Sequence, residues 1–173
     1  MLLDPNLAVD PWTEAYLYAA ARADHVRNGL RPALARGAVV VCERYLDSSL
    51  AYQGAGRGLG VEEIRALNER AVDGLLPHRT FYLGLDAVER ERRARELDAA
   101  LDRIEQAGAE FMQRAEACFE ELARREPERV LRLDATRPPG ELVEEVLREV
   151  RGLLYTQPDS REGKEAEGRG FGP

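Results

Sequence analysis

The chain has 173 residues, of which 44% are hydrophobic and 33% are charged, and its formal net charge is -7. This length predicts one domain with a sizeable core, and the acidic balance argues against a general nucleic-acid-binding surface. No apolar run approaches the ~18 residues that a membrane-spanning helix needs, and the N-terminus lacks the features of a secretory signal. We therefore expect a cytoplasmic globular protein that binds neither nucleic acid nor membrane.

A long helix is predicted near the start of the chain. Asp10 is a good capping residue, and the proline after it suits the first turn of a helix. Apolar residues then recur at helical spacing over residues 12–30. Pro32 is expected to kink this helix, and Gly37 is expected to end it.

Three short apolar segments predict the strands of a parallel sheet. Ala38–Cys42 is rich in valine and bounded by glycine and charge, which is typical of a strand buried on both faces. Thr80–Leu83 and Val130–Leu133 predict two further strands. Cys42 and Cys118 are expected to be buried as small hydrophobic residues. Helical patterns separate or follow the strands at residues 61–74, 87–98, 106–125 and 139–153, so the fold class is α/β.

The composition changes at the C-terminal end of the chain. Residues 156–173 contain four glycines and two prolines but almost nothing apolar to bury, which predicts a disordered tail. The remaining residues, 1–155, are expected to form one domain.

The densest group of candidate ligand-binding residues directly follows the predicted strand 38–42, as ERYLDSSLAYQGAGRGLG. Ligands of open parallel sheets bind beyond the carboxyl ends of the strands. The guanidinium of Arg44 matches phosphate oxygens, while serine hydroxyls and the Gln53 amide can bind the edge of a base. Glu43 and Arg44 could instead be an ordinary surface pair at the end of a strand.

This stretch resembles the thymidylate kinase signature, in which an Asp-Arg-Tyr type triplet precedes a Ser-Ser/Asn-x-Ala-Tyr-Gln-Gly run. Tyr18 and Arg22 lie four residues apart, hence on one helix face. They are similar to the family's aromatic residue that stacks on thymine and the arginine that reaches its carbonyl. Tyr18 could also be a core aromatic residue of an amphipathic helix.

Two later segments extend the resemblance. An arginine-rich stretch at about 90–105 resembles the family's mobile lid, whose arginines neutralise charge during phosphoryl transfer; a solvated helix face is the other interpretation. The candidate lid arginines are Arg92, Arg93 and Arg95. Asp102 and Glu105 match the entry of the helix after the lid and are candidate substrate-binding residues.

The last predicted strand leads into RLDATRPPGEL, which resembles the loop that lines the family's adenine pocket. The candidate ATP-binding residues there are Ala135, Thr136 and Arg137.

The resemblance implies a P-loop-kinase-like enzyme that transfers the γ-phosphoryl group of ATP to dTMP, with Mg²⁺, to give dTDP. In this interpretation Arg44 holds the acceptor phosphate, and Glu43 organises magnesium or the attacking oxygen. The residues implied to select the base and sugar are Tyr18, Arg22, Ser48, Ser49, Tyr52 and Gln53. The family is usually dimeric through helices that include the one matching 11–36, so a homodimer is possible.

One family feature is missing from the printed sequence. It contains no Gly-x-x-x-x-Gly-Lys-Ser/Thr loop to hold the donor phosphates, and Lys164 is its only lysine. The resemblance places that loop and the first two strands upstream, with the first strand between the predicted strands 38–42 and 80–83. We therefore expect the chain alone to be inactive. A non-catalytic nucleotide-binding or interaction module, or a kinase for another monophosphate, remains an alternative.

Overall fold

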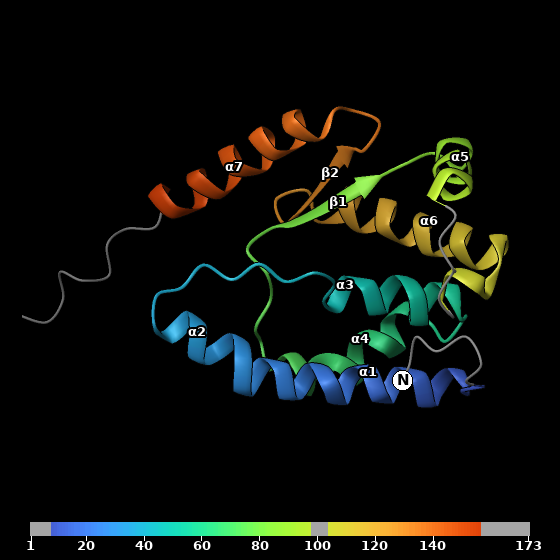
Figure 1. Cartoon of the computed structure of the whole chain (residues 1–173). Coiled ribbons are helices and arrows are strands. Elements are labelled where there is room, and N and C mark those ends of the chain that lie inside the picture. Colours follow the sequence, from blue (N-terminus) through green and yellow to red (C-terminus); the bar gives the residue numbers. More distant parts are fainter. Residues whose placement is uncertain (1–7, 98–103, 157–173) are drawn as a thin grey trace, which may run out of the picture.

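A computed structural model describes residues 8–97 and 104–156 of the chain, which form the α/β fold of Figure 1. The predicted first helix is confirmed. It begins as α1 (Pro11–Asp24), passes through the π-helical turn η1 (His25–Leu30) and continues as α2 (Arg31–Ala35). Asp10 caps it, because its carboxylate accepts a hydrogen bond from the backbone N–H of Trp12 at 2.9 Å.

The irregular turn in this helix lies immediately before Pro32. A proline has no N–H, and its ring crowds the carbonyl four residues earlier, so the regular α-helical bonding pattern is interrupted there. The helix continues through a wider, π-helical turn: the backbone N–H of Arg31 bonds to the carbonyl of Val26, five residues back. Gly37 follows the end of α2 with a φ of 78°, in the left-handed region that favours glycine.

The glycine-rich stretch after residue 45 is helical, which sequence reasoning did not predict. It forms α3 (Leu46–Ser49) and the π-helical η2 (Leu50–Gly56). Gly54 and Gly56 of η2 are both buried. A Cβ atom on Gly56 would lie 2.5 Å from the ring of Phe111. These glycines permit close helix packing.

The other predicted helices are confirmed, with shifted ends. They are α4 (Val61–Val72), α5 (Ala87–Leu97), α6 (Ala109–Arg125), which follows the short 3₁₀ turn η3 (Glu105–Ala107), and α7 (Pro139–Thr156). Since Thr156 closes α7, the helix enters the predicted tail by one residue, and residues 157–173 lie outside the described part of the chain. Within that part, no helix is long and apolar enough to cross a membrane.

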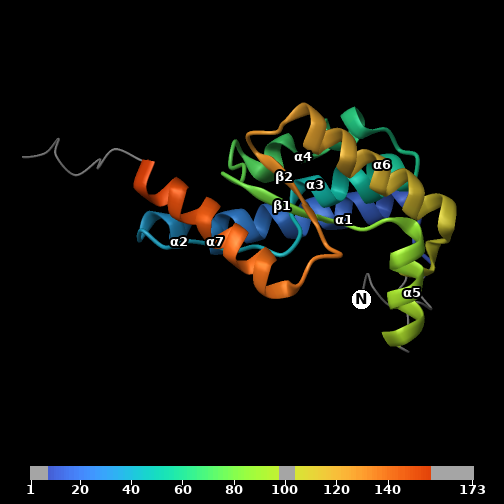
Figure 2. The same ribbon diagram turned by 90° about the horizontal axis from the view of Figure 1, so that it is seen from above.

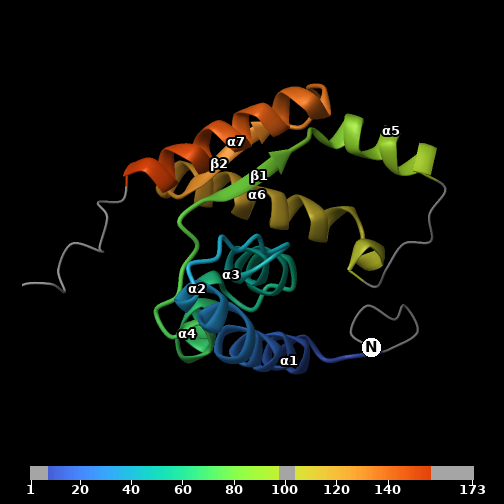
Figure 3. The same ribbon diagram turned by 60° about the vertical axis from the view of Figure 1, so that its left-hand side comes forward.

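The hydrophobic core lies where α1, α3, η2, α4 and α6 meet, and Figures 1 and 3 show α3 between α1 and α6. Its buried members are Ala15, Leu46, Leu50, Ala51, Ile64, Val72, Ala115, Cys118 and Leu122. The expected burial of Cys118 is thus confirmed. This core supports the segments that carry the candidate ligand-binding residues.

Two of the three predicted strands are confirmed. Strands β1 (Thr80–Gly84) and β2 (Val130–Asp134) pair in parallel, with Thr80 opposite Val130 and Gly84 opposite Asp134. Figures 1 and 3 show α6 on one side of the pair and α7 on the other, and Figure 2 shows α5 extending away from the end of β1.

The predicted buried strand 38–42 was wrong. In the described residues this segment pairs with no strand, and the side chains of Val39 and Val41 are 59% and 94% exposed. Cys42 is exposed as well, which corrects its expected burial. A strand needs a neighbour to bond its backbone groups, and the two strands of the described sheet pair with each other.

Candidate functional site

A cavity of about 670 Å³ lies between the first helix and the segment from residue 43 to η2. The residues that the sequence interpretation assigned to the base, the sugar, the acceptor phosphate and magnesium line this one cavity, although they come from two distant parts of the chain. They are Tyr18, Arg22, Glu43, Arg44, Ser48, Ser49, Tyr52 and Gln53.

Sequence reasoning missed other residues of the same wall. Ala21 and His25 belong to the face of the first helix that carries Tyr18, so their helical spacing of three and seven residues from Tyr18 could have identified them. Tyr45, Ile104 and Met112 also line the cavity. Tyr45 is the third residue of the triplet that begins at Glu43. Ile104 and Met112 are hydrophobic residues outside any motif, so no sequence pattern pointed to them.

Arg22 is held in place by oxygen atoms of the protein. It is buried, and its guanidinium donates hydrogen bonds to Asn68, to the backbone carbonyl of Tyr45 at 3.0 Å and to the hydroxyl of Ser49 at 2.8 Å. Burial lowers the pKa of Arg22, whereas the nearby Tyr45, Cys42 and Asp47 raise it. A guanidinium has more N–H donors than these bonds use, so Arg22 can also donate to an oxygen atom of a ligand.

Arg44 has an unusual backbone conformation. Its φ is 63°, a left-handed value that costs a non-glycine residue about 1–2 kcal/mol. Its guanidinium lies 5.2 Å from the centre of the Tyr52 ring, and both side chains line the cavity. The turn thus places an exposed cation at the cavity wall.

Glu43 is an exposed carboxylate beside Arg44 on the cavity wall. The described residues contain no group of three or more histidine, cysteine, aspartate or glutamate side chains that could hold a metal ion. Magnesium at a phosphate-binding site needs only one or two protein carboxylates, because phosphates and water supply its other ligands. Glu43 fits that limited role.

Tyr52 is fixed by other aromatic rings. It stacks on Phe111 with ring centres 6.0 Å apart and meets the edge of Phe119 at 5.8 Å. Phe119 also stacks on Tyr82 at 5.1 Å, and burial, followed by the charge of nearby Glu120, raises the pKa of Tyr82. The cavity wall at Tyr52 is therefore rigid.

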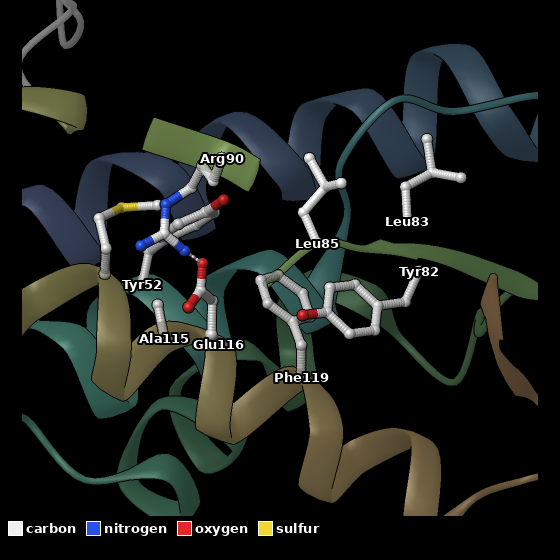
Figure 4. Close-up of a pocket in the computed structure, with 9 residues that line it drawn as sticks. Tyr52, Tyr82, Leu83, Leu85, Arg90, Ala115, Glu116 and Phe119 are labelled. Carbon is white, nitrogen blue, oxygen red and sulfur yellow. Dashed lines mark ion pairs between the residues drawn. The ribbon is translucent and has the colours of Figure 1, made fainter. Parts of the chain in front are cut away.

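Tyr52 also borders a second, smaller cavity of about 160 Å³, shown in Figure 4. Arg90 of α5 and Glu116 of α6 face each other across one end of it as an ion pair, and the rings of Tyr82 and Phe119 lie at the other end. This ion pair attaches α5 to α6.

The predicted lid arginines do not line the larger cavity. Each pairs with a glutamate of α5 itself: Arg92 and Arg93 with Glu89, and Arg95 with Glu91. The hydrogen bonds from Arg92 and Arg93 lower the pKa of Glu89 to about 2. Their catalytic role stays a prediction.

The predicted ATP-binding loop lies between β2 and α7, and its residues are absent from the lining of both cavities. Ala135 is buried, Thr136 donates its backbone N–H and hydroxyl to Asp134, and Arg137 pairs with Glu141 and Glu145. The Thr136 bonds lower the pKa of Asp134. The role in ATP binding is untested.

The two candidate residues at the entry of the post-lid helix cannot be placed at the cavity. Asp102 lies outside the described residues, and so does the side chain of Glu105. Their substrate-binding roles remain predictions.

The fold and the residues around the cavity define a nucleotide-kinase-like α/β protein, and comparison with known proteins identifies its family. The thymidylate kinase family model matches residues 1–146. The thymidylate kinase of Deinococcus radiodurans is 48% identical over 147 residues, which cover 84% of this chain and 70% of that protein. The one from Limosilactobacillus fermentum is 42% identical over 153 residues, covering 84% of this chain and 69% of that protein. The chain belongs to the thymidylate kinase family.

A solved structure agrees with this assignment at the level of the fold. The crystal structure of thymidylate kinase from Ehrlichia chaffeensis superposes with a TM-score of 0.63 at 24% sequence identity, covering 87% of this chain and 68% of that one. The resemblance seen in the sequence is thus confirmed for the family and for the α/β fold.

Proposed function

We propose that the cavity of about 670 Å³ is the acceptor site of a dTMP kinase, which transfers the γ-phosphoryl group of ATP to dTMP to give dTDP. One observation carries the proposal: two separate sequence segments, chosen for resemblance to one family, supply the walls of a single cavity. Its volume lies within the range of about 300–1,000 Å³ that is typical of small-molecule sites.

The side chains around the cavity suit the parts of dTMP. Arg44 would bind the phosphate with charge-assisted hydrogen bonds. Arg22 would donate to a base carbonyl from a position already fixed by Asn68, Tyr45 and Ser49. Because Arg22 is held by these protein partners, less ordering of its side chain is needed on binding, which favours affinity.

Base and sugar would be held by the remaining cavity residues. Tyr18 would stack on the ring of the base, while Ser48, Ser49 and Gln53 offer polar groups. Tyr52 adds an aromatic wall held by Phe111. These assignments all come from resemblance to the family together with a place on the cavity wall.

The cofactors of the proposed reaction are ATP and Mg²⁺. Glu43 would hold magnesium together with phosphate oxygens, and the ion would neutralise the charge of the phosphates during transfer. For the donor nucleotide we retain the loop of Ala135, Thr136 and Arg137, and for closure of the site the lid arginines, as predictions.

The 173-residue chain lacks one element that phosphoryl transfer requires. The chain covers about 70% of the length of the two relatives named above. Its sequence contains no Gly-x-x-x-x-Gly-Lys-Ser/Thr loop. Phosphoryl transfer depends on positioning and electrostatics from that loop, so we infer that this chain alone binds dTMP without transferring phosphate. Val39 and Val41 are exposed, and their segment pairs with no strand of the described residues. The same observations favour the alternative of a non-catalytic module that retains a nucleotide site.

Binding and activity assays separate these possibilities. Calorimetric titration of the 173-residue chain should show saturable binding of dTMP, weaker binding of UMP and AMP, and no turnover with ATP. Restored turnover when the chain is preceded by the first segment of a relative would favour the kinase over the non-catalytic module. Failure of the folded chain to bind dTMP would refute the acceptor site.

A homodimer through the first helix also remains a proposal. Trp12, Tyr16 and Leu17 of α1 are 40%, 58% and 37% exposed, and Trp12 and Tyr16 lie 6.1 Å apart. Large exposed apolar side chains on one helix suit a protein interface. Sedimentation velocity of wild type and Tyr16→Glu would show whether this surface holds two copies together.

A further inference from the structure

A fully buried carboxylate lies behind the cavity and has no part in the proposed contacts with dTMP. Glu14 of α1 has 0% of its surface exposed. It accepts a hydrogen bond from the Nε2 atom of Gln53 at 2.7 Å and pairs with Nη2 of Arg57 at 3.2 Å. Burying a charged carboxylate is costly unless it is paired and hydrogen-bonded. The two partners meet that requirement.

Glu14 determines which end of the Gln53 amide can bind a ligand. A carboxylate only accepts hydrogen bonds, so Gln53 must present its NH₂ group to Glu14. Gln53 is buried and lines the cavity, so its carbonyl oxygen is then the end left for a ligand. An acceptor at this place suits a base with a ring N–H and disfavours a base that offers a ring acceptor.

The same carboxylate supports a second part of the wall. Arg57, held by Glu14, lies with its guanidinium 4.8 Å from the centre of the Phe111 ring, and Phe111 stacks on Tyr52. Removal of the charge at Glu14 is therefore expected to affect Gln53 directly and Tyr52 only through two intermediate side chains.

We propose that Glu14 is a positioning residue for base specificity: it fixes the Gln53 amide so that the cavity prefers pyrimidines with N–H at ring position 3. This rests on the proposed acceptor site. Thymine and uracil carry that N–H, whereas cytosine has an acceptor there. A site built to accept a ligand's hydrogen bond discriminates against an analogue that cannot donate it.

The test compares dTMP with 5-methyl-dCMP, which keeps the methyl group and the sugar phosphate but changes the base edge. In Glu14→Gln the new amide can donate or accept, so Gln53 is free to reverse. The ratio of the dissociation constants for 5-methyl-dCMP and dTMP, measured by calorimetry, should fall about tenfold, as expected for one lost hydrogen-bond preference. Glu62→Gln, on the exposed face of α4, is the control and should leave the ratio unchanged.

The outcomes are distinct. A Glu14→Gln protein that weakens binding of both nucleotides equally would show a merely structural role and overturn the proposal. If Glu14→Gln does not fold by circular dichroism, Gln53→Met must lower the ratio instead, and an unchanged ratio overturns the proposal. A folded wild type that binds neither nucleotide refutes the acceptor site itself, whereas normal dTMP binding with an unaltered ratio in the variants refutes only the role of Glu14.

Discussion

The helical region around the cavity and the strand pair β1–β2 differ in how well their side chains are buried. Behind the cavity, polar side chains such as Arg22 and Gln53 are buried and bonded to protein partners. In the strand pair, Leu83 of β1 is 57% exposed, and Val41 of the segment 38–42 is 94% exposed. A helix bonds its own backbone groups, but a strand depends on its neighbours. The acceptor region can therefore be ordered while the sheet remains short.

The largest effect should come from the polar contact that joins these two regions. Asp47 of α3 accepts two hydrogen bonds of 2.7 Å from Arg129 and one of 2.9 Å from Thr80 at the start of β1. Burial alone would lower the pKa of Arg129, but its bonds to Asp47 and Glu126 raise it. Asp47→Ala leaves a largely buried cation without its main partner, which should cost about 3–5 kcal/mol of unfolding free energy in urea titrations.

Asp73→Asn is the control for that experiment, because asparagine tolerates the left-handed backbone of this residue, whose φ is 49°. Asp73 pairs with Arg31 at 3.0 Å, but both side chains are well exposed, so its loss should cost less than about 1 kcal/mol. Equal losses for the two variants would contradict the view that the Asp47 contact connects the two regions.

Apolar truncations compare the two regions directly. Leu50 is 0% exposed within the core, so Leu50→Ala should lower the unfolding free energy by about 2–5 kcal/mol through lost burial and a cavity. Val41→Ala removes methyl groups that are already in water and should change it by less than about 0.5 kcal/mol. A large cost at Val41 would mean that the segment 38–42 is covered in solution, for example by another copy of the chain.

A substitution at Arg44 should separate stability from binding. Arg44→Gly relieves the left-handed backbone and should raise the unfolding free energy by up to ~1 kcal/mol, yet weaken dTMP binding about 10- to 100-fold through the lost charge-assisted bonds. Arg44→Ala should weaken binding equally without the gain in stability. Identical unfolding midpoints for Gly and Ala would argue against the turn seen at this residue.

The smallest effect concerns an exposed carboxylate of α6. Hydrogen bonds from Arg124 and Arg125 lower the pKa of Glu121 from its ordinary 4.5 to about 2. A lowered pKa in the folded state means that the contribution to stability is present above pH 4.5 and is lost as the pH falls toward 2. Since Glu121 is exposed, the effect on stability should be small. Carboxyl NMR titration should give a lower midpoint for Glu121 than for the same residue in an Arg124→Ala, Arg125→Ala double variant.

Sequence reasoning succeeded where one segment contains its own signal. The capped first helix, the amphipathic α4 and α6, and the strands β1 and β2 all follow from local spacing. The segment 38–42 has an equally clear pattern, but a strand forms only if a neighbour is available, and that information is not local. The π-helical η2 was missed because its glycines also suit a loop, and only their contacts with Val61 and Phe111 explain them.

For the candidate site as well, the residues could be predicted from the sequence, but their tertiary contacts could not. Resemblance to the family identified Arg44 and Tyr52 in the motif and Tyr18 and Arg22 on the first helix, all of which line one cavity. Resemblance could not reveal that Arg22 is bound to Asn68, which lies 46 residues further along the chain. The buried pair of Glu14 and Arg57 was invisible for the same reason, because it depends on tertiary contact.

The most direct test of the acceptor site is an amide proton–nitrogen NMR titration of the 173-residue chain with dTMP. The account predicts saturable shifts of the amide signals at the first helix and at residues 43–53, with little change in α7, and loss of these shifts in Arg44→Ala. A folded chain whose spectrum does not respond to dTMP, or responds only outside the cavity, would contradict it.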